Sequence, residues 1–174
     1  MIVATTGTNE QPFDRLVRSV AALDVDEELL LQYGSSRVPH GRGTWVDYLP
    51  FSELEDAMRR ARIVISHAGV GSIMLARRCG KVPIVMPRRL SAGEAVDDHQ
   101  HRLAVRLSRI GVVAIAEDER QLAELVLAGP GAAANGDGGL EAGTLVTELH
   151  AFFADRAALA EPVIRVDVPT EVIF

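Results

Sequence analysis

The stretch IVISHAGVGSIMLARRCGKVPIVMP, residues 63–87, decides the fold: its pattern is a strand, a glycine-rich turn, a helix and a second strand. The β-branched run 63–65 is typical of a buried parallel strand. A helix is predicted over about 72–79, because a glycine follows it directly. The apolar run 82–86 is the next predicted strand. The stretch therefore predicts one strand–helix–strand unit of a parallel sheet.

The turn SHAGVGS, residues 66–72, has the properties of an anion site. Gly69 and Gly71 let a ligand approach the backbone closely, and the free N–H groups at a helix start attract negative charge. Ser72 can cap the helix or bind a phosphate oxygen, and His67 can donate to the same oxygen. In an α/β sheet, such a turn favours a diphosphate, and hence a nucleotide or a nucleotide-sugar.

A second interpretation of the same turn is structural. The glycines can simply make the tight turn of a strand–helix–strand crossover. Their spacing fits neither GxGxxG nor GxxxxGK[ST], so neither the dinucleotide fingerprint nor the P-loop is indicated.

The rest of the chain alternates strands and helices. Strands are predicted at 1–5, 28–33, 44–48, 63–65, 82–86 and 112–115, and helices at about 13–20, 52–61, 72–79, 96–110 and 117–128. Ser52 is expected to cap its helix, with Glu55 as the capping-box partner. The alternation predicts an α/β fold, a doubly wound parallel sheet, whose ligands bind at the carboxyl ends of the strands. Gly7, Thr8 and the pair Arg88–Arg89 would lie at that edge.

Length and composition exclude several classes of protein. The chain has 174 residues and a net charge of −6, without the basic surface of a nucleic-acid binder. Its one cysteine excludes an internal disulfide, and no run approaches the ~18 apolar residues of a membrane span. The start, residues 1–4, is expected to be a strand rather than a signal peptide, which fits the cytoplasm.

We expect three segments. Residues 1–128 would form the nucleotide-sugar-binding domain, 129–140 (GPGAAANGDGGL) a flexible linker, and 141–174 a C-terminal helix and tail. The apolar stripe of that helix consists of Leu145, Leu149, Phe152 and Phe153. Two interpretations are open: the helix folds back on its own domain, or it, or the apolar tail 163–174, docks on a partner.

Three motifs support a resemblance to a known family: IVATTGTNEQPFDRLV from residue 2, SHAGVGSIMLARRCGKVPIVMPR from residue 66, and GEAVDDHQHRLA from residue 93. In their order and spacing they resemble the C-terminal, donor-binding half of family 28 glycosyltransferases of GT-B architecture. They are most similar to a stand-alone branch in which that half is a separate polypeptide. This branch includes the eukaryotic subunit of the dolichol-linked UDP-GlcNAc transferase and its counterparts in bacterial exopolysaccharide synthesis. The resemblance covers residues 1 to about 116.

The resemblance implies a donor-binding set. In such folds the turn 66–72 holds the diphosphate of a UDP-sugar, a histidine at the position of His67 contacts a phosphate, and residues matching His99 and Gln100 bind sugar hydroxyls. The implied set is Gly7, Thr8, Ser66, His67, Ala68, Gly69, Gly71, Ser72, His99 and Gln100, with His67 stabilising the leaving group. Glu94 lies in the same loop as the sugar-binding pair, and Asp97 and Asp98 are expected to cap the helix that follows.

One position departs from the family pattern. Many relatives have a glutamate that binds both ribose hydroxyls where this chain has Leu75. A leucine cannot accept those hydrogen bonds. Ribose recognition would then rest on backbone groups or another acid, or the nucleotide would bind weakly.

The resemblance implies an inverting transfer from a UDP-sugar to a polyprenyl-diphosphate-linked acceptor in cell-surface polysaccharide synthesis. A membrane-anchored partner subunit would bring the acceptor and keep the protein at the inner face of the membrane, in the cytoplasm. No metal or cofactor is expected, because no suitable DxD-type carboxylate pair is present, and no base for the acceptor is evident. The alternatives are a non-catalytic UDP-sugar-binding or scaffold subunit, and an unrelated Rossmann-like enzyme such as an epimerase half.

Overall fold

A computed structural model describes residues 1–130, 147, 149–152 and 154, and within them the strands form one parallel sheet of six in the order β3-β2-β1-β4-β5-β6. The strands are β1 (Ile2–Thr5), β2 (Leu29–Gln32), β3 (Thr44–Val46), β4 (Ile63–Ser66), β5 (Ile84–Val85) and β6 (Ala114–Ile115). The order reverses between β1 and β4, as in doubly wound folds. The predicted fold class is confirmed.

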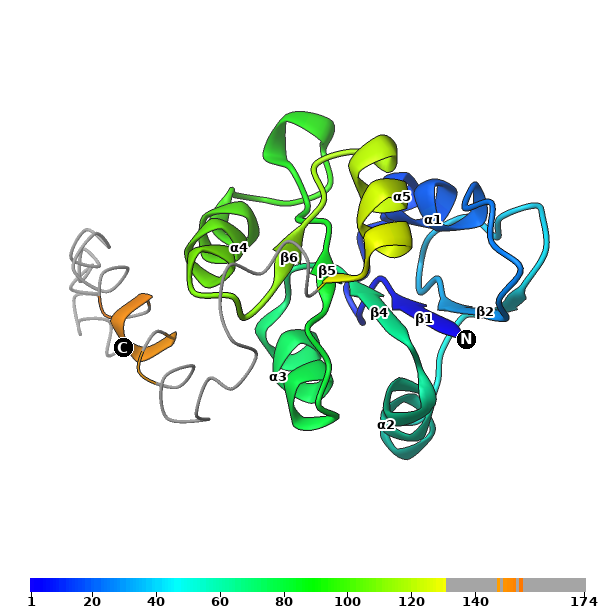
Figure 1. The fold of residues 1–174 in the computed structure, drawn as a ribbon. Coiled ribbons are helices and arrows are strands. Elements are labelled where there is room, and N and C mark those ends of the chain that lie inside the picture. The colour runs from blue at the N-terminus through cyan, green and yellow to red at the C-terminus, as the bar shows by residue number, and fades with distance from the viewer. Residues whose placement is uncertain (131–146, 148, 153, 155–174) are drawn as a thin grey trace, which may run out of the picture.

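Helices cover both faces of the sheet (Figure 1). They are α1 (Asp14–Ala21), α2 (Phe51–Arg60), α3 (Val70–Arg78), α4 (His99–Arg109) and α5 (Glu119–Ala128), and a short 3₁₀ turn, η1, spans Leu90–Ala92. α1 and α5 pack on one face, whereas α2, α3 and α4 pack on the other. This arrangement leaves the two edges, where the strands begin and end, for loops.

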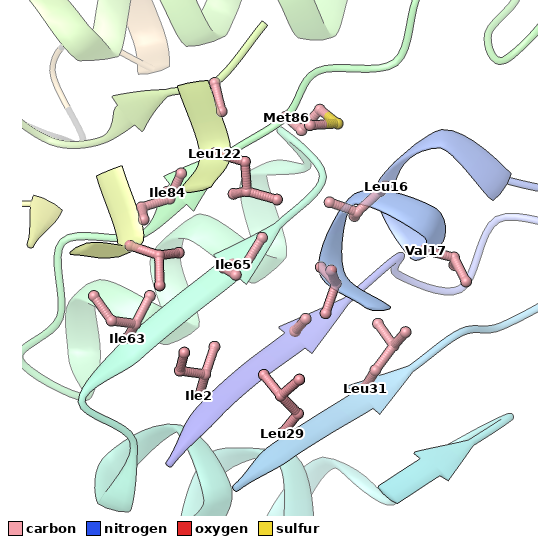
Figure 2. Packing of buried hydrophobic residues seen from close by; sticks show 14 of the residues in the cluster. Ile2, Leu16, Val17, Leu29, Leu31, Ile63, Ile65, Ile84, Met86 and Leu122 are labelled. Atoms are coloured by element: carbon pink, nitrogen blue, oxygen red, sulfur yellow. The ribbon is translucent and has the colours of Figure 1, made fainter. Parts of the chain in front are cut away.

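Alternating side chains of the strands build the core on each face. Ile63 and Ile65 pack toward α1 and α5, whereas Val64 between them packs toward α2 and α3. Figure 2 shows the core on the face that α1 and α5 cover, where side chains of neighbouring strands meet Leu16 of α1 and Leu122 of α5. Fully burying an aliphatic side chain stabilises the fold by about 1.5–3 kcal/mol. The continuous apolar strands thus specify a sheet that is covered on both faces.

Two predicted helix starts are wrong. α2 begins at Phe51 after Pro50, whose carbonyl already accepts from the N–H of Leu54, and no side chain caps it. Ser52 therefore lies inside the helix, where it cannot cap it. α3 begins at Val70, with Gly69 as its N-cap residue, so Ser72 lies in the first turn rather than at the cap.

The region around β5 also differs from the prediction. β5 has two residues, Ile84–Val85, instead of the predicted run 82–86, because its pairing with β4 and β6 is limited to these positions. α4 begins at His99 rather than at residue 96. The carboxylate of Asp97 accepts from the N–H of His99 at 3.0 Å, and Asp98 is the N-cap residue without a side-chain capping bond. Of the two predicted caps, only Asp97 supplies a carboxylate to the helix start.

The described residues near the C-terminus pack on the domain itself. Leu149 is buried with Leu103 and Leu107 of α4, and Phe152 packs against the same cluster. The other predicted stripe residues, Leu145 and Phe153, lie outside the described residues, as do the tail 163–174 and all but the first two residues of the linker. Within the described part of the chain, no helix is long and apolar enough to cross a membrane.

Candidate functional site

The loops that follow β1 and β4 meet at the carboxyl edge of the sheet, around the ring of His67. A Cβ added to Gly7 would lie 2.3 Å from Cε1 of that ring, and one added to Gly69 would lie 2.2 Å from Nε2. Gly7 also has a φ of +78°, which favours glycine. The imidazole is therefore held between two backbone segments, and neither glycine leaves room for a larger residue.

His67 is neutral at physiological pH. Burial, and then the nearby Arg88 guanidinium, lower the pKa of His67 from 6.5 to about 4, and a hydrogen bond with the Thr5 backbone opposes them. Its Nδ1 is buried and has no hydrogen-bond partner among the described residues. A neutral imidazole offers one N–H donor and one acceptor. His67 can thus hold an oxygen anion by hydrogen bonding, without a formal charge.

The start of α3 is open to an anion. No side chain caps the helix, and no acidic residue lies in its first turn. The first N–H groups of a helix have no partner within it, and they carry the positive end of its dipole. A Cβ on Gly71 would meet nothing within 4 Å, so open space lies beside the backbone of this first turn. The backbone from Gly69 to Ser72 can accept a phosphate group.

Two side chains of the predicted set do not face this opening. Ser66 is fully buried, and its Oγ donates to the carbonyl of His67 at 2.9 Å. Ala68 is 1% exposed and packs with Ile73 in the core. Their contribution to the site is limited to their backbone. Thr8, by contrast, is exposed on the loop after β1.

His99 and Gln100 lie in the first turn of α4. The Nδ1 of His99 lies 2.7 Å from Oδ1 of Asp97, and the ring of Phe152 meets the His99 ring edge-on at a centroid distance of 6.5 Å. Oε1 of Gln100 is buried, and no described residue bonds it. Within the described chain, no hydrogen bond joins this pair to the His67 turn. The pair is therefore a separate group of candidate polar contacts at the same edge.

The residues of the loop after β5 are more buried than the sequence indicates. Arg88 is 1% exposed, whereas its neighbour Arg89 is partly exposed and pairs with Glu117 at 2.8 Å. Glu94, in the loop that precedes the predicted sugar-binding pair, is 8% exposed, and its carboxylate accepts from Nε and Nη2 of Arg15 at 3.0 and 2.8 Å. A carboxylate engaged in this way fixes the loop and is not free for a ligand.

A buried glutamine, Gln32 of β2, supports the loop after β1 by hydrogen bonding. Gln32 donates from Nε2 to the carbonyl of Gly7 at 3.3 Å and accepts from the N–H of Leu49 at 3.2 Å. It is 2% exposed. The sequence places this residue at the end of a predicted strand, and its polar character inside an apolar run is the only signal of this role.

Leu75 lies in the core. It is 7% exposed and packs with Val3, Met58 and Val64 on the face that α2 and α3 cover. Its side chain contributes to the contact between α3 and the rest of this face. The leucine therefore serves packing at a position where the resemblance implied ribose binding.

No group of three or more histidine, cysteine, aspartate or glutamate side chains is placed to hold a metal ion within the described residues. At this edge the carboxylate of Glu94 is instead paired with Arg15.

Comparison with known proteins gives three findings. Residues 1–130 match the glycosyltransferase family 28 C-terminal domain. The chain is 32% identical over 126 residues to the UDP-N-acetylglucosamine transferase subunit ALG13 of Yarrowia lipolytica, covering 63% of this chain and 61% of that protein. A crystal structure described as the glycotransferase of kitacinnamycin superposes with a TM-score of 0.52 at 22% identity, covering 93% of this chain and 44% of that one.

These likenesses differ in what they show. At 22% identity the solved structure shows a shared fold alone. The chain spans 61% of the length of the curated relative, so that protein's whole activity does not transfer with the match. The match to the C-terminal domain covers most of the chain and agrees with the three motifs around the carboxyl edge. This chain belongs to glycosyltransferase family 28, of which it carries the C-terminal domain.

Proposed function

We propose that this protein is the donor-binding subunit of an inverting glycosyltransferase that uses a UDP-sugar. The observation that carries this proposal is the anion-binding arrangement after β4: uncapped amides at the start of α3 beside the neutral, partly unpartnered ring of His67. Family membership supports a sugar nucleotide as the source of that anion. The diphosphate would lie on the amides from Gly69 to Ser72, with the sugar toward His99 and Gln100.

In the proposed reaction, the acceptor oxygen forms a bond to the anomeric carbon while the bond from that carbon to the β-phosphate oxygen breaks. UDP leaves with the electron pair, and the configuration inverts. The α3 amides, the Ser72 hydroxyl and a neutral N–H of His67 would stabilise the charge that develops on the leaving oxygen. The mechanism that we propose needs no metal ion for this step.

The acceptor hydroxyl must also lose its proton. A histidine whose pKa is about 4 is a weak base at neutral pH, which argues against His67 in this role. We assign the base to a partner subunit that also brings a polyprenyl-diphosphate-linked acceptor. The relative from Yarrowia lipolytica is itself described as a subunit of a transferase, which supports a partner. The complex would work in cell-surface polysaccharide synthesis at the cytoplasmic face of the membrane.

A second candidate function is a UDP-sugar-binding or scaffold subunit without catalytic activity. The core position of Leu75 favours it, because no carboxylate stands there to bind ribose. The two functions differ in turnover rather than in binding.

Isothermal titration of the protein with UDP, and with ADP as the control, tests the proposal. Binding of UDP that persists in EDTA and exceeds that of ADP supports a donor site, and no binding of UDP or of any UDP-sugar contradicts it. A transfer assay with the partner and a polyprenyl-linked acceptor then separates the candidates. Binding without transfer would support the scaffold.

A further inference from the structure

Arg88, three residues after the end of β5, is among the largest fully buried side chains of the described residues, although it is a cation. Its Nη1 donates to the carbonyls of Gln11, Pro12 and Glu94 at 2.9, 3.1 and 3.2 Å, and its Nη2 donates to the carbonyl of Thr6 at 3.3 Å. A buried charge costs several kcal/mol unless hydrogen bonds compensate it. Here the compensation comes from two loops that lie far apart in the sequence.

The chemistry of these contacts requires an arginine. The planar guanidinium presents several donors in a fixed fork, which an ammonium group cannot reproduce. Its Cζ also lies 4.6 Å from the centre of the Phe13 ring, so an aromatic face supports the cation from one side. Its hydrogen-bond acceptors in the described chain are backbone carbonyls, so none of these bonds joins the cation to a carboxylate.

A short series of contacts leads from Arg88 to the site. The carbonyl that its Nη2 holds belongs to Thr6, and the next residue, Gly7, lies directly against the ring of His67. The same guanidinium is the second cause, after burial, of the lowered pKa of His67. Arg88 thus acts on the imidazole twice, through the backbone that confines it and through a charge that adds to burial in lowering its pKa.

We propose that Arg88 is a positioning residue: it locks the loop after β1 to the loop after β5 and thereby holds the His67 ring in the place where it meets a diphosphate. Its role goes beyond stabilising the fold. The identity of the ligand rests on the proposed function, but the state of the His67 ring in the free protein does not.

Three variants test this role. Arg88→Met removes the charge and the donors, Arg88→Lys keeps the charge without the fork, and Arg62→Met is the matched control. Arg62 lies at the opposite edge of the sheet, where it pairs with Glu27 and donates to the carbonyl of Val126 at 3.2 Å. Like Arg88 it donates to a backbone carbonyl, but it is partly exposed and paired with a carboxylate, and no contact joins it to His67 among the described residues.

Two measurements are made on each folded variant. The first is the pKa of His67 in the ligand-free protein, from a ¹⁵N NMR titration of the imidazole, with the His67→Asn variant used only to assign the signal. The second is the dissociation constant for UDP from isothermal titration. The midpoint of urea unfolding, measured alongside, gives the loss of stability that all three variants share.

We expect Arg88→Met to raise the pKa of His67 by about one pH unit. We expect it to weaken UDP binding by roughly tenfold or more, as the loss of well-oriented contacts does. Arg88→Lys should keep the pKa of His67 low and still weaken UDP binding. Arg62→Met should lower the urea midpoint without changing either property.

The proposal is overturned if both Arg88 variants match Arg62→Met, with the His67 pKa and the UDP affinity of the native protein. Should Arg88→Met not fold, Arg88→Lys decides through its UDP affinity, and unchanged affinity overturns the proposal. Should the native protein bind no UDP, the proposed function fails by itself. The His67 titration of the Arg88 variants then decides the positioning role: a raised pKa in Arg88→Met supports it, and an unchanged one refutes it.

Discussion

The polar groups at the two edges of the sheet differ in whether they have a hydrogen-bond partner. At the amino edge, the Arg62 guanidinium pairs with Glu27, and this bond is the largest cause of the low pKa of Glu27, about 2. At the carboxyl edge, three buried polar atoms lack a partner among the described residues: Nδ1 of His67, Nε of Arg88 and Oε1 of Gln100. Folded proteins rarely leave buried polar atoms unsatisfied. Among the described residues, the buried polar side-chain atoms without a partner therefore lie at the carboxyl edge, where ligands of such sheets bind.

The sharpest test of this contrast removes the central side chain of the open edge. His67→Ala should lower the rate of sugar transfer, in the assay with the partner subunit, by roughly 10²–10³-fold, as the loss of one donor to a developing oxyanion does. Circular dichroism should show that the fold is retained. A transfer rate equal to that of the native protein would refute the role of His67.

Next in size is the effect of filling the space beside the ring. Gly69→Ala would bring a Cβ within 2.2 Å of His67 Nε2, so the ring must move, and UDP binding should weaken by about 100-fold. Gly71→Ala is the matched variant, because its Cβ would meet nothing within 4 Å. The ¹⁵N NMR signal of the His67 ring in the free protein should shift in Gly69→Ala and stay unchanged in Gly71→Ala, and equal shifts would contradict the confinement of His67.

The pH dependence of stability distinguishes the edges further. The native pKa of His67, about 4, lies below the ordinary value of 6.5, so the unfolded chain binds more protons between these values. The contribution of His67 is therefore complete above about pH 6.5 and is lost as the pH falls to about 4, by roughly 2–3 kcal/mol. Urea unfolding at pH 7.5 and 4.5 should show a smaller decrease for His67→Asn than for the native protein; parallel decreases would argue against the buried neutral ring.

The smallest effect is expected at the amino edge. The native pKa of Glu27 is about 2, against an ordinary value of 4.5, so its contribution is present above about pH 4.5 and is lost as the pH falls toward 2. Because the Arg62 side chain is 46% exposed, solvent limits this contribution to less than about 1 kcal/mol. The difference in urea midpoint between the native protein and Glu27→Gln should shrink from pH 6 to pH 3. A difference that is constant with pH would exclude the ion pair as its source.

The sequence predicted the parts of the fold that local patterns encode. The apolar run at β4 and the glycine turn after it lie where expected, and so does α5, whose N-cap Asp118 accepts from the N–H of Gln121 at 2.8 Å. Helix starts were less predictable. A capping-box pattern at Ser52 predicts a start at that residue, but Pro50 two residues earlier is the N-cap and the helix begins at Phe51.

The site was predicted in part. The structure brings Gly7, His67 and Gly69 into contact. This contact is expected for two turns that lie at the same edge of the sheet. It also shows that the side chains of Ser66 and Ala68 are buried, which the motif alone does not reveal. The binding roles of the whole set stay predictions that the titrations above can test.

What the sequence alone determined is the alternation of strands and helices, the parallel sheet that this alternation requires, and the glycine-rich turn at its carboxyl edge. These follow from periodicity and from the backbone freedom of glycine, which are local properties. Only the tertiary structure decided that Arg88 is buried, that Glu94 binds Arg15, and that the His67 ring is neutral. Each of these depends on segments distant in the chain, because burial and charge pairing are set by what the fold brings together in space.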